Sequence, residues 1–142
     1  MATTRTATTN WEGNLLEGKG AVSLDSSGVG TFDVSWPSRA EAANGKTSPE
    51  ELIAAAHSSC FSMALSHGLA QAGTPPTSVQ TKADVTFQPG TGITGIHLTV
   101  NAVVPGLDAD GFATAAENAK ANCPVSQALA GTTITLTAEL IG

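Results

Sequence analysis

Alternating apolar and polar positions mark the first forty residues and three later stretches of the chain. Near the N-terminus, Phe32, Val34 and Trp36 alternate with polar residues, and a turn at 25–28 separates them from an earlier short apolar run. Alternation with period two is typical of strands with one buried face. The same alternation recurs over residues 79–87, 96–104 and 134–140. The pattern therefore predicts short N-terminal strands, a later pair of longer strands and one final strand.

A long, almost uncharged stretch runs from Leu52 to about Ala72. Ser48 is placed to cap it, Pro49 suits the first helical position, and Glu51 is placed to complete a capping box. Apolar or small residues occupy nearly every face, which is typical of a helix that is buried on nearly every side. Because one chain of 142 residues offers little surface to cover such a helix, we expect a partner subunit to cover the rest.

The remaining segments complete the predicted order of elements. Residues 37–46 contain proline, asparagine and glycine and are expected to form a loop. Asp108 is placed to cap a second helix, which Cys123 and Pro124 interrupt, and residues 125–130 suit another short helical turn. Strands grouped in runs, with a long helix between them, indicate an α+β fold in which a largely antiparallel sheet packs on the central helix. We expect one domain over residues 1–142.

Composition excludes several classes of protein. Hydrophobic residues make up 41% and charged residues 13%, so the chain reads as globular, and the net charge of −6 argues against a nucleic-acid surface. No apolar run approaches the roughly 20 residues that cross a bilayer, so no membrane span is expected. The N-terminus lacks the apolar region of a secretory signal, which favours the cytoplasm.

The candidate chemistry rests on two cysteines, Cys60 and Cys123. In a reducing compartment, two thiols indicate redox chemistry, a metal site or two buried side chains. A thiol near its ordinary pKa is only about 3% ionised at pH 7, so a reactive Cys60 would need help, which the Arg39 guanidinium could give. Cys123, before a proline at a helix boundary, would gain acidity from the following helical turn. Simple burial of both thiols stays open at this point.

His57 lies three residues before Cys60 and is the other candidate partner of the thiols. A Cys-His pair and a zinc site shared with Cys123 are both conceivable, but the spacing is not that of a zinc finger, and we expect no metal. His67 and His97 suit ordinary surface positions on a helix and a strand. Trp11 and Trp36 suit packing positions, and either could wall an apolar pocket; these aromatic residues have no assigned chemistry.

Two stretches carry a family resemblance. Residues 48–66 read SPEELIAAAHSSCFSMALS, and residues 119–126 read AKANCPVS. They resemble the central-helix signature and the second cysteine motif of the OsmC/Ohr family of thiol peroxidases. Matches at 11–13, at 18–20 and in the closing strand extend the likeness over nearly the whole chain. The OsmC branch is the more similar one, because its arginine lies shortly before the central helix, where Arg39 stands; Ser48 replaces the common Asn and leaves the helix cap intact.

The resemblance implies a role for each of four residues. Cys60 would be the peroxidatic thiolate that attacks the O–O bond and becomes a sulfenic acid, and Cys123 would resolve it as a disulfide. Arg39 would stabilise the thiolate and the developing negative charge on the leaving oxygen. Glu50 would hold Arg39 through a carboxylate–guanidinium pair. The apolar side chains of Phe61, Met63 and Leu65 would suit an organic substrate, or would be plain core.

Helix geometry adds a constraint on this implied site. Glu50 and Cys60 are ten residues apart, so about 15 Å separates them along one straight helix. Arg39 must then span a long gap, the helix must bend, or Glu50 must come from another subunit. We favour the last alternative, since the apolar helix already indicates a partner and the family is similarly dimeric, with sites at the interface.

The resemblance implies a homodimeric enzyme that reduces organic hydroperoxides, and hydrogen peroxide more weakly, in oxidative or osmotic stress defence. It needs no cofactor, and a dithiol, such as the lipoylated proteins that serve some family members, would reduce it. The competing hypothesis is a non-catalytic redox sensor or small-molecule binder with the same fold. The presence together of Cys60, Cys123, Arg39 and Glu50 favours the enzyme, because a binder has no need of all four.

Overall fold

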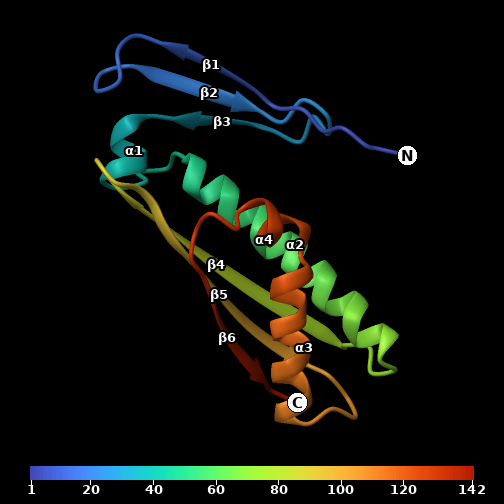
Figure 1. Cartoon of the computed structure of the whole chain (residues 1–142). Coiled ribbons are helices and arrows are strands. Elements are labelled where there is room, and N and C mark those ends of the chain that lie inside the picture. The colour runs from blue at the N-terminus through green and yellow to red at the C-terminus, as the bar shows by residue number, and fades with distance from the viewer. The chain divides into compact units, whose positions relative to one another are not determined.

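The N-terminal strands form a small antiparallel sheet. The computed structural model describes all of residues 1–142 and places β1 (Thr8–Glu12), β2 (Lys19–Ser23) and β3 (Thr31–Val34) in sequence order within this sheet (Figure 1). Trp11 stands opposite Gly20, where a Cβ would lie 2.7 Å from the indole ring. Only glycine therefore lets this ring lie across β2. The turn predicted at 25–28 is present, with Gly28 at φ +68°.

A short helix, α1 (Trp36–Ala40), follows β3. The sequence predicts a loop over 37–46, and this prediction is wrong for the first residues of that stretch. The reason is a local capping box: Ser35 Oγ accepts a hydrogen bond from the Ser38 N–H at 3.2 Å, and Ser38 Oγ accepts one from the Ser35 N–H at 3.1 Å. Pro37 near the start of the helix loses no hydrogen bond there, so a proline that suggested a loop is compatible with a helix.

The C-terminal strands form a second three-stranded sheet. β4 (Ser78–Gln88) pairs antiparallel with β5 (Gly92–Val103), and β5 pairs in parallel with β6 (Ile134–Leu140). The chain folds as two compact units, Met1–Leu52 and Ile53–Gly142, and each holds one sheet. Where the pattern predicts one sheet, the strands are thus divided between two. The pairing is largely antiparallel, as predicted.

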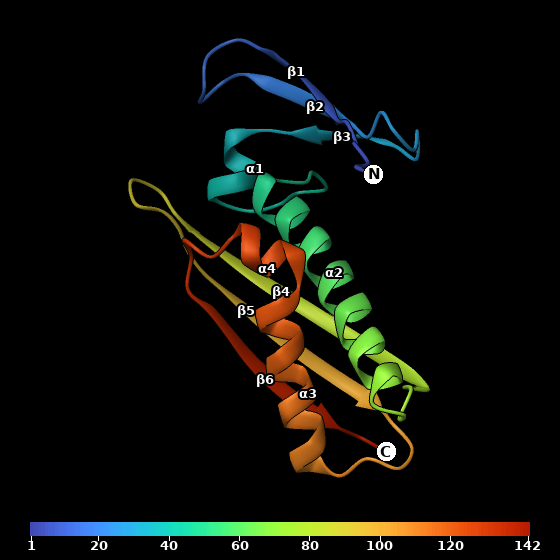
Figure 2. The same ribbon diagram turned by 45° about the vertical axis from the view of Figure 1, so that its right-hand side comes forward.

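The helices of the second unit cover one face of its sheet. The unit contains most of α2 (Pro49–Gln71) together with α3 (Ala109–Asn122) and α4 (Pro124–Ala128). Both views show α2 and α3 across the same face of the sheet, with α4 at the end of α3 (Figure 1, Figure 2). Apolar side chains of α2, α3 and β5 form the core there: Phe61, Leu65, Leu69, Ile96, Leu98, Val100, Ala102, Phe112, Ala116 and Ala119.

The start and end of α2 and the start of α3 lie where the capping residues and glycine of the sequence predict them. Ser48 Oγ accepts from the Glu51 N–H at 3.2 Å, as predicted, while the Glu51 carboxylate accepts from Thr47 Oγ1 at 2.6 Å. Gly73, at φ +89°, follows the end of α2, and Asp108 caps α3 by accepting from the Gly111 N–H at 2.8 Å. Local capping chemistry therefore places both long helices.

The long helix α2 is not buried on every side within one chain. Phe61, Leu65 and Leu69 face the core, but Met63 on another face is 71% exposed, and small residues around it are exposed too. As expected, the single chain does not cover every face of this helix, and the partner subunit that would cover the rest stays a prediction. None of the helices, α2 included, combines the length and the hydropathy that a bilayer crossing requires.

Candidate active site

Arg39 lies in the last turn of α1 and forms an ion pair with Glu50, the second residue of α2. Arg39 Nε donates to both carboxylate oxygens at 3.1 Å, and Nη2 donates to Oε2 at 2.8 Å. A planar guanidinium bound through two nitrogens is fixed in orientation as well as in position. The Glu50 side chain is only 8% exposed and Arg39 is 31% exposed, so the carboxylate acts as an inner anchor while part of the cation stays accessible.

An apolar pocket of about 360 Å³ adjoins this ion pair within the first unit. Its walls combine two indole rings, several aliphatic side chains and the arginine: Thr9, Trp11, Leu15, Val22, Val34, Ser35, Trp36, Arg39, Pro49 and Leu52. The two tryptophans thus line a cavity, the second of the two roles that the sequence left open. The pocket presents one cation in apolar surroundings, an arrangement that accepts an organic molecule with one polar group.

The second unit brings the two cysteines together. Cys60 Sγ, on α2, lies 3.0 Å from Cys123 Sγ, which stands between α3 and α4. Both are free thiols; Cys123 is fully buried and Cys60 is partly exposed. A disulfide places its sulfurs about 2.05 Å apart, so the pair needs only a small movement to form one. The distance decides between the alternatives: these are not two unrelated buried thiols.

The surroundings affect the two thiols in opposite directions. Burial raises the pKa of Cys60, and the neighbouring Cys123 raises it further. Burial would also raise the pKa of Cys123, but hydrogen bonds with the Cys60 thiol, with Ser126 and with the Val125 backbone outweigh it and lower that pKa. Within this unit, negative charge is therefore held more easily on Cys123 than on Cys60. A nucleophilic Cys60 requires an additional positive group.

His57 and Ser126 form a buried pair beside the thiols. His57 Nε2 and Ser126 Oγ lie 2.7 Å apart, and both residues are buried. His57 Nδ1 has no hydrogen-bond partner, and burial lowers the pKa of the imidazole. Ser126 is a residue for which the sequence argument assigned no role, although it ends the AKANCPVS motif. Its place in this motif could have drawn attention to Ser126, but only the fold shows that Ser126 contacts His57, 69 residues away in the sequence.

The other candidates have no part in this cluster. His67 is exposed, and His97 is hydrogen-bonded to Thr135 and Thr137 on the neighbouring strand. Phe61 and Leu65 are core residues with 0% exposure, which is the second of the two alternatives that the sequence left open for them. No group of three or more His, Cys, Asp or Glu side chains is arranged as a metal site.

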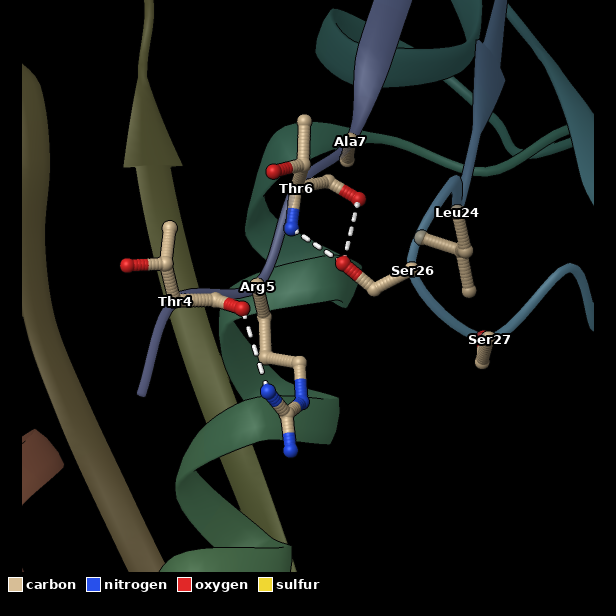
Figure 3. Close-up of a pocket in the computed structure, with 7 residues that line it drawn as sticks. All are labelled: Thr4, Arg5, Thr6, Ala7, Leu24, Ser26 and Ser27. Carbon is tan, nitrogen blue, oxygen red and sulfur yellow. Dashed lines mark hydrogen bonds between the residues drawn. The ribbon is translucent and has the colours of Figure 1, made fainter. Parts of the chain in front are cut away.

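The second arginine, Arg5, lies in a hollow near the N-terminus, which is otherwise lined by hydroxyl-bearing residues together with Ala7 and Leu24. Arg5 Nη1 donates to the carbonyl of Thr4 at 3.0 Å, and the Thr6 N–H donates to Ser26 Oγ at 2.6 Å (Figure 3). The hollow contains no thiol and no carboxylate. Of the two arginines, Arg39 is therefore the one with a carboxylate partner.

Comparison with known proteins gives the class of this fold and site. The family model of OsmC-like proteins matches residues 42–139. Peroxiredoxin OsmC of Escherichia coli (strain K12) is 47% identical over 123 residues, covering 84% of this chain and 85% of the relative. The solved structure of the organic hydroperoxide resistance protein OhrB of Bacillus subtilis has a TM-score of 0.63 at 26% identity, covering 96% of this chain and 98% of that one. An OsmC-like protein of Mycoplasma pneumoniae, at 12% identity, reaches a TM-score of 0.75 over both full chains and shows the fold alone.

The mixed α+β fold and the match to curated and solved relatives define the class of this protein as an oxidoreductase. The chain belongs to the OsmC-like family, and its activity is that of a peroxidase.

Proposed function

We propose that the chain reduces organic hydroperoxides, and hydrogen peroxide more weakly, by a two-cysteine mechanism. The single observation that carries the mechanism is the 3.0 Å distance between a partly exposed Cys60 sulfur and a buried Cys123 sulfur. The Cys60 thiolate attacks the terminal peroxide oxygen, the O–O bond breaks, and the alkoxide takes a proton and leaves as the alcohol. Cys60 is then a sulfenic acid, Cys123 displaces its hydroxyl as water, and a dithiol reduces the resulting disulfide.

Arg39 is proposed to supply the positive charge that Cys60 lacks. Burial and Cys123 raise the pKa of Cys60, so a cation is needed both to hold the thiolate and to stabilise the departing alkoxide. Glu50 accepts three hydrogen bonds from the Arg39 guanidinium and thereby fixes its orientation. Glu50 thus acts through Arg39, as a positioning residue.

The apolar pocket beside Arg39 supports the choice of an organic substrate. Two tryptophan rings and aliphatic side chains would hold the hydrocarbon part of a hydroperoxide, and the guanidinium at the wall would hold its oxygens. Hydrogen peroxide fills little of such a pocket and gains less from it. A structural neighbour is named an organic hydroperoxide resistance protein, which agrees with this preference.

A homodimer is proposed as the working form. Met63 on α2 is 71% exposed in the single chain, and a second copy would bury it. Glu50 and Cys60 are separated by about 15 Å along α2, so we propose that the Arg39–Glu50 pair of one protomer serves the thiols of its partner. Such a dimer would work in a reducing compartment such as the cytoplasm, where a dithiol, with lipoylated proteins as candidates, restores the thiols during oxidative or osmotic stress.

The decisive experiment measures consumption of cumene hydroperoxide with dihydrolipoamide as reductant. Cys60→Ser should lower the rate about a thousandfold or more, because it removes the nucleophile. Cys123→Ser should keep one rapid turnover and lose sustained turnover with the dithiol. Equal rates for wild type and Cys60→Ser would overturn the mechanism and leave a redox-sensing or binding role. Ser59→Ala, which changes the exposed residue beside Cys60, is the matched control and should stay near the wild-type rate.

A further inference from the structure

Two buried polar side chains next to the thiols have no place in the mechanism above. His57 is 0% exposed and Ser126 is 5% exposed, and they reach each other from α2 and α4. Burial of polar groups costs free energy unless they are hydrogen-bonded, and the Nδ1 atom of His57 has no partner at all. His57 lies one helical turn before Cys60, and Ser126 lies three residues after Cys123. The pair therefore links the segments that carry both thiols.

The unpartnered nitrogen indicates which way the hydrogen bond runs. Burial lowers the pKa of His57, so the ring is neutral and carries one N–H. A buried N–H without an acceptor is rarer and more costly than an acceptor without a donor. We therefore assign the proton to Nε2, which donates to Ser126 Oγ at 2.7 Å, and leave Nδ1 as a bare acceptor.

The Ser126 hydroxyl is then free to donate its own hydrogen elsewhere. Cys123 is the N-cap of α4 and Ser126 is its third residue, so both side chains lie at the same end of this helix. The Ser126 side chain is among the groups that lower the pKa of Cys123. Directed at the Cys123 sulfur, that hydrogen would extend the observed 2.7 Å contact between the imidazole and the hydroxyl into a chain of two hydrogen bonds, in which each donor strengthens the next.

We propose that His57 and Ser126 are positioning residues that hold Cys123 as the attacking sulfur of the disulfide-forming step. The proposal deepens the two-cysteine mechanism and rests on it. Ser126 aims its O–H at Cys123, and His57 prevents that hydroxyl from turning to another acceptor. The Cys123 sulfur is thereby kept 3.0 Å from Cys60 and able to carry negative charge.

The step assisted by this pair is balanced. The Cys123 sulfur attacks the sulfur of the Cys60 sulfenic acid, an S–S bond forms and the S–O bond breaks. The hydroxide that leaves combines with the proton lost by Cys123 and departs as water. Peroxide has already supplied the oxidising equivalents, so no other oxidant is needed.

The test follows one turnover of the reduced protein with one equivalent of cumene hydroperoxide. Ser126→Ala should consume peroxide within about twofold of wild type, while disulfide formation slows about tenfold or more, the factor expected from one lost hydrogen bond to a charged group. A cyclic 1,3-diketone should then trap the accumulated Cys60 sulfenic acid, seen by mass spectrometry. Ser126→Thr, which keeps the hydroxyl, should restore rapid closure.

Ser62→Ala is the matched control. Ser62 lies on α2, the helix that carries Cys60, and its half-buried hydroxyl donates to the Ser58 carbonyl and to Thr81 Oγ1 instead of to a thiol. It should close the disulfide at the wild-type rate. A folded Ser126→Ala protein that closes its disulfide as fast as wild type would overturn the proposal. Should Ser126→Ala fail to fold, His57→Leu removes the same hydrogen-bond chain at its other end and is expected to slow closure similarly.

A second measurement does not depend on peroxidase activity. In a Cys60→Ser background Cys123 is the one remaining thiol, and its ionisation is followed by thiolate absorbance at 240 nm. Adding Ser126→Ala should move the midpoint upward, because it removes one of the groups that lower the pKa of Cys123. His57 is the other titratable group of the cluster, α4 brings none, and Lys120 and Glu117 of α3 pair with each other at 3.5 Å. An unchanged midpoint would refute the role of Ser126, whereas a shifted midpoint without peroxide consumption by wild type would refute only the peroxidase mechanism.

Discussion

At the scale of single residues, charge placement governs this site. Cys60 is partly exposed, as the proposed nucleophile must be, but its surroundings in the second unit raise its pKa. Cys123 is enclosed, and hydrogen bonds lower its pKa. A thiol that resists ionisation until a cation assists it stays unreactive in the absence of the complete site. This difference in exposure and pKa suits the proposed roles, in which Cys60 reacts with peroxide and Cys123 reacts only with Cys60.

His57 gives a pH-dependent prediction at this scale. Its pKa in the folded protein is lowered below 6.5 by burial, so below about pH 6.5 the unfolded chain binds a proton that the folded protein does not. Stability should therefore fall as the pH decreases from 6.5, by up to about 1.4 kcal/mol per pH unit from this residue. Urea unfolding of wild type and His57→Gln at pH 7.5 and pH 5.5 measures this loss of unfolding free energy. Between the two pH values, His57→Gln should lose less stability than wild type.

The exposed His67 on the same helix provides the matched control. His67→Gln should keep the wild-type dependence on pH, because it leaves the buried His57 unchanged. If His57→Gln and wild type lose the same stability between the two pH values, His57 is not held neutral by the fold.

At the scale of elements, α1 and the first turn of α2 act together. The capping box at Ser35 and Ser38 fixes a helix of five residues, and its last turn presents Arg39 to Glu50. The Glu50 carboxylate also lies at the positive end of α2, where the helix dipole favours a negative charge. The starts of these two helices thus fix the orientation of the Arg39 guanidinium. Ser38 Oγ also donates a hydrogen bond to the Thr47 carbonyl at 3.1 Å, which links α1 to the residues just before α2.

Adjacent glutamates at the start of α2 allow a matched prediction. Glu50→Gln should reduce kcat/KM for cumene hydroperoxide about tenfold and stability by about 1–3 kcal/mol, because it removes the carboxylate that binds the Arg39 guanidinium. Glu51→Gln, at an exposed position that contacts Thr47, should change both by far less. Steady-state kinetics and urea unfolding measure the two effects, and equal losses in both variants would show that Glu50 has no special part.

At the scale of the whole molecule, the proposed dimer determines which chain completes which site. A mixed dimer of Arg39→Ala and Cys60→Ser protomers distinguishes the two arrangements. If the arginine of one protomer serves the thiols of its partner, the mixture contains one intact site and regains activity that both parent variants lack. If each protomer is self-sufficient, the mixed dimer has no intact site and stays inactive.

The control for this complementation uses the exposed face of α2. Met63→Glu in both chains should place a charge in the proposed interface, prevent association and abolish the regained activity, with monomers seen by sedimentation. Val29→Glu is matched to it, since Val29 is 73% exposed and Met63 is 71% exposed. It should leave both the dimer and the complementation intact.

Much of the fold could be read from short-range patterns. Alternation placed the strands, Asp108 and Ser48 marked the helix starts, and the interruption at Cys123 is the junction of α3 and α4. These signals depend on residues a few positions apart, whose geometry the backbone fixes locally. The helix α1 is not predicted, because Pro37 indicates a loop and the capping box formed by Ser35 and Ser38 is recognised only in the structure.

The sequence by itself determined the residue types of the chemistry, the capped helices that carry them and the family to which they belong. Only the tertiary structure decided that the two sulfurs lie 3.0 Å apart, that Ser126 meets His57, and that Phe61 is core while Trp11 and Trp36 line a pocket. The physical reason is the range of the interactions. Capping and periodicity act within a few residues, whereas the contacts of the thiols join positions more than sixty residues apart, and such contacts exist only after helices and sheet have packed around a shared core.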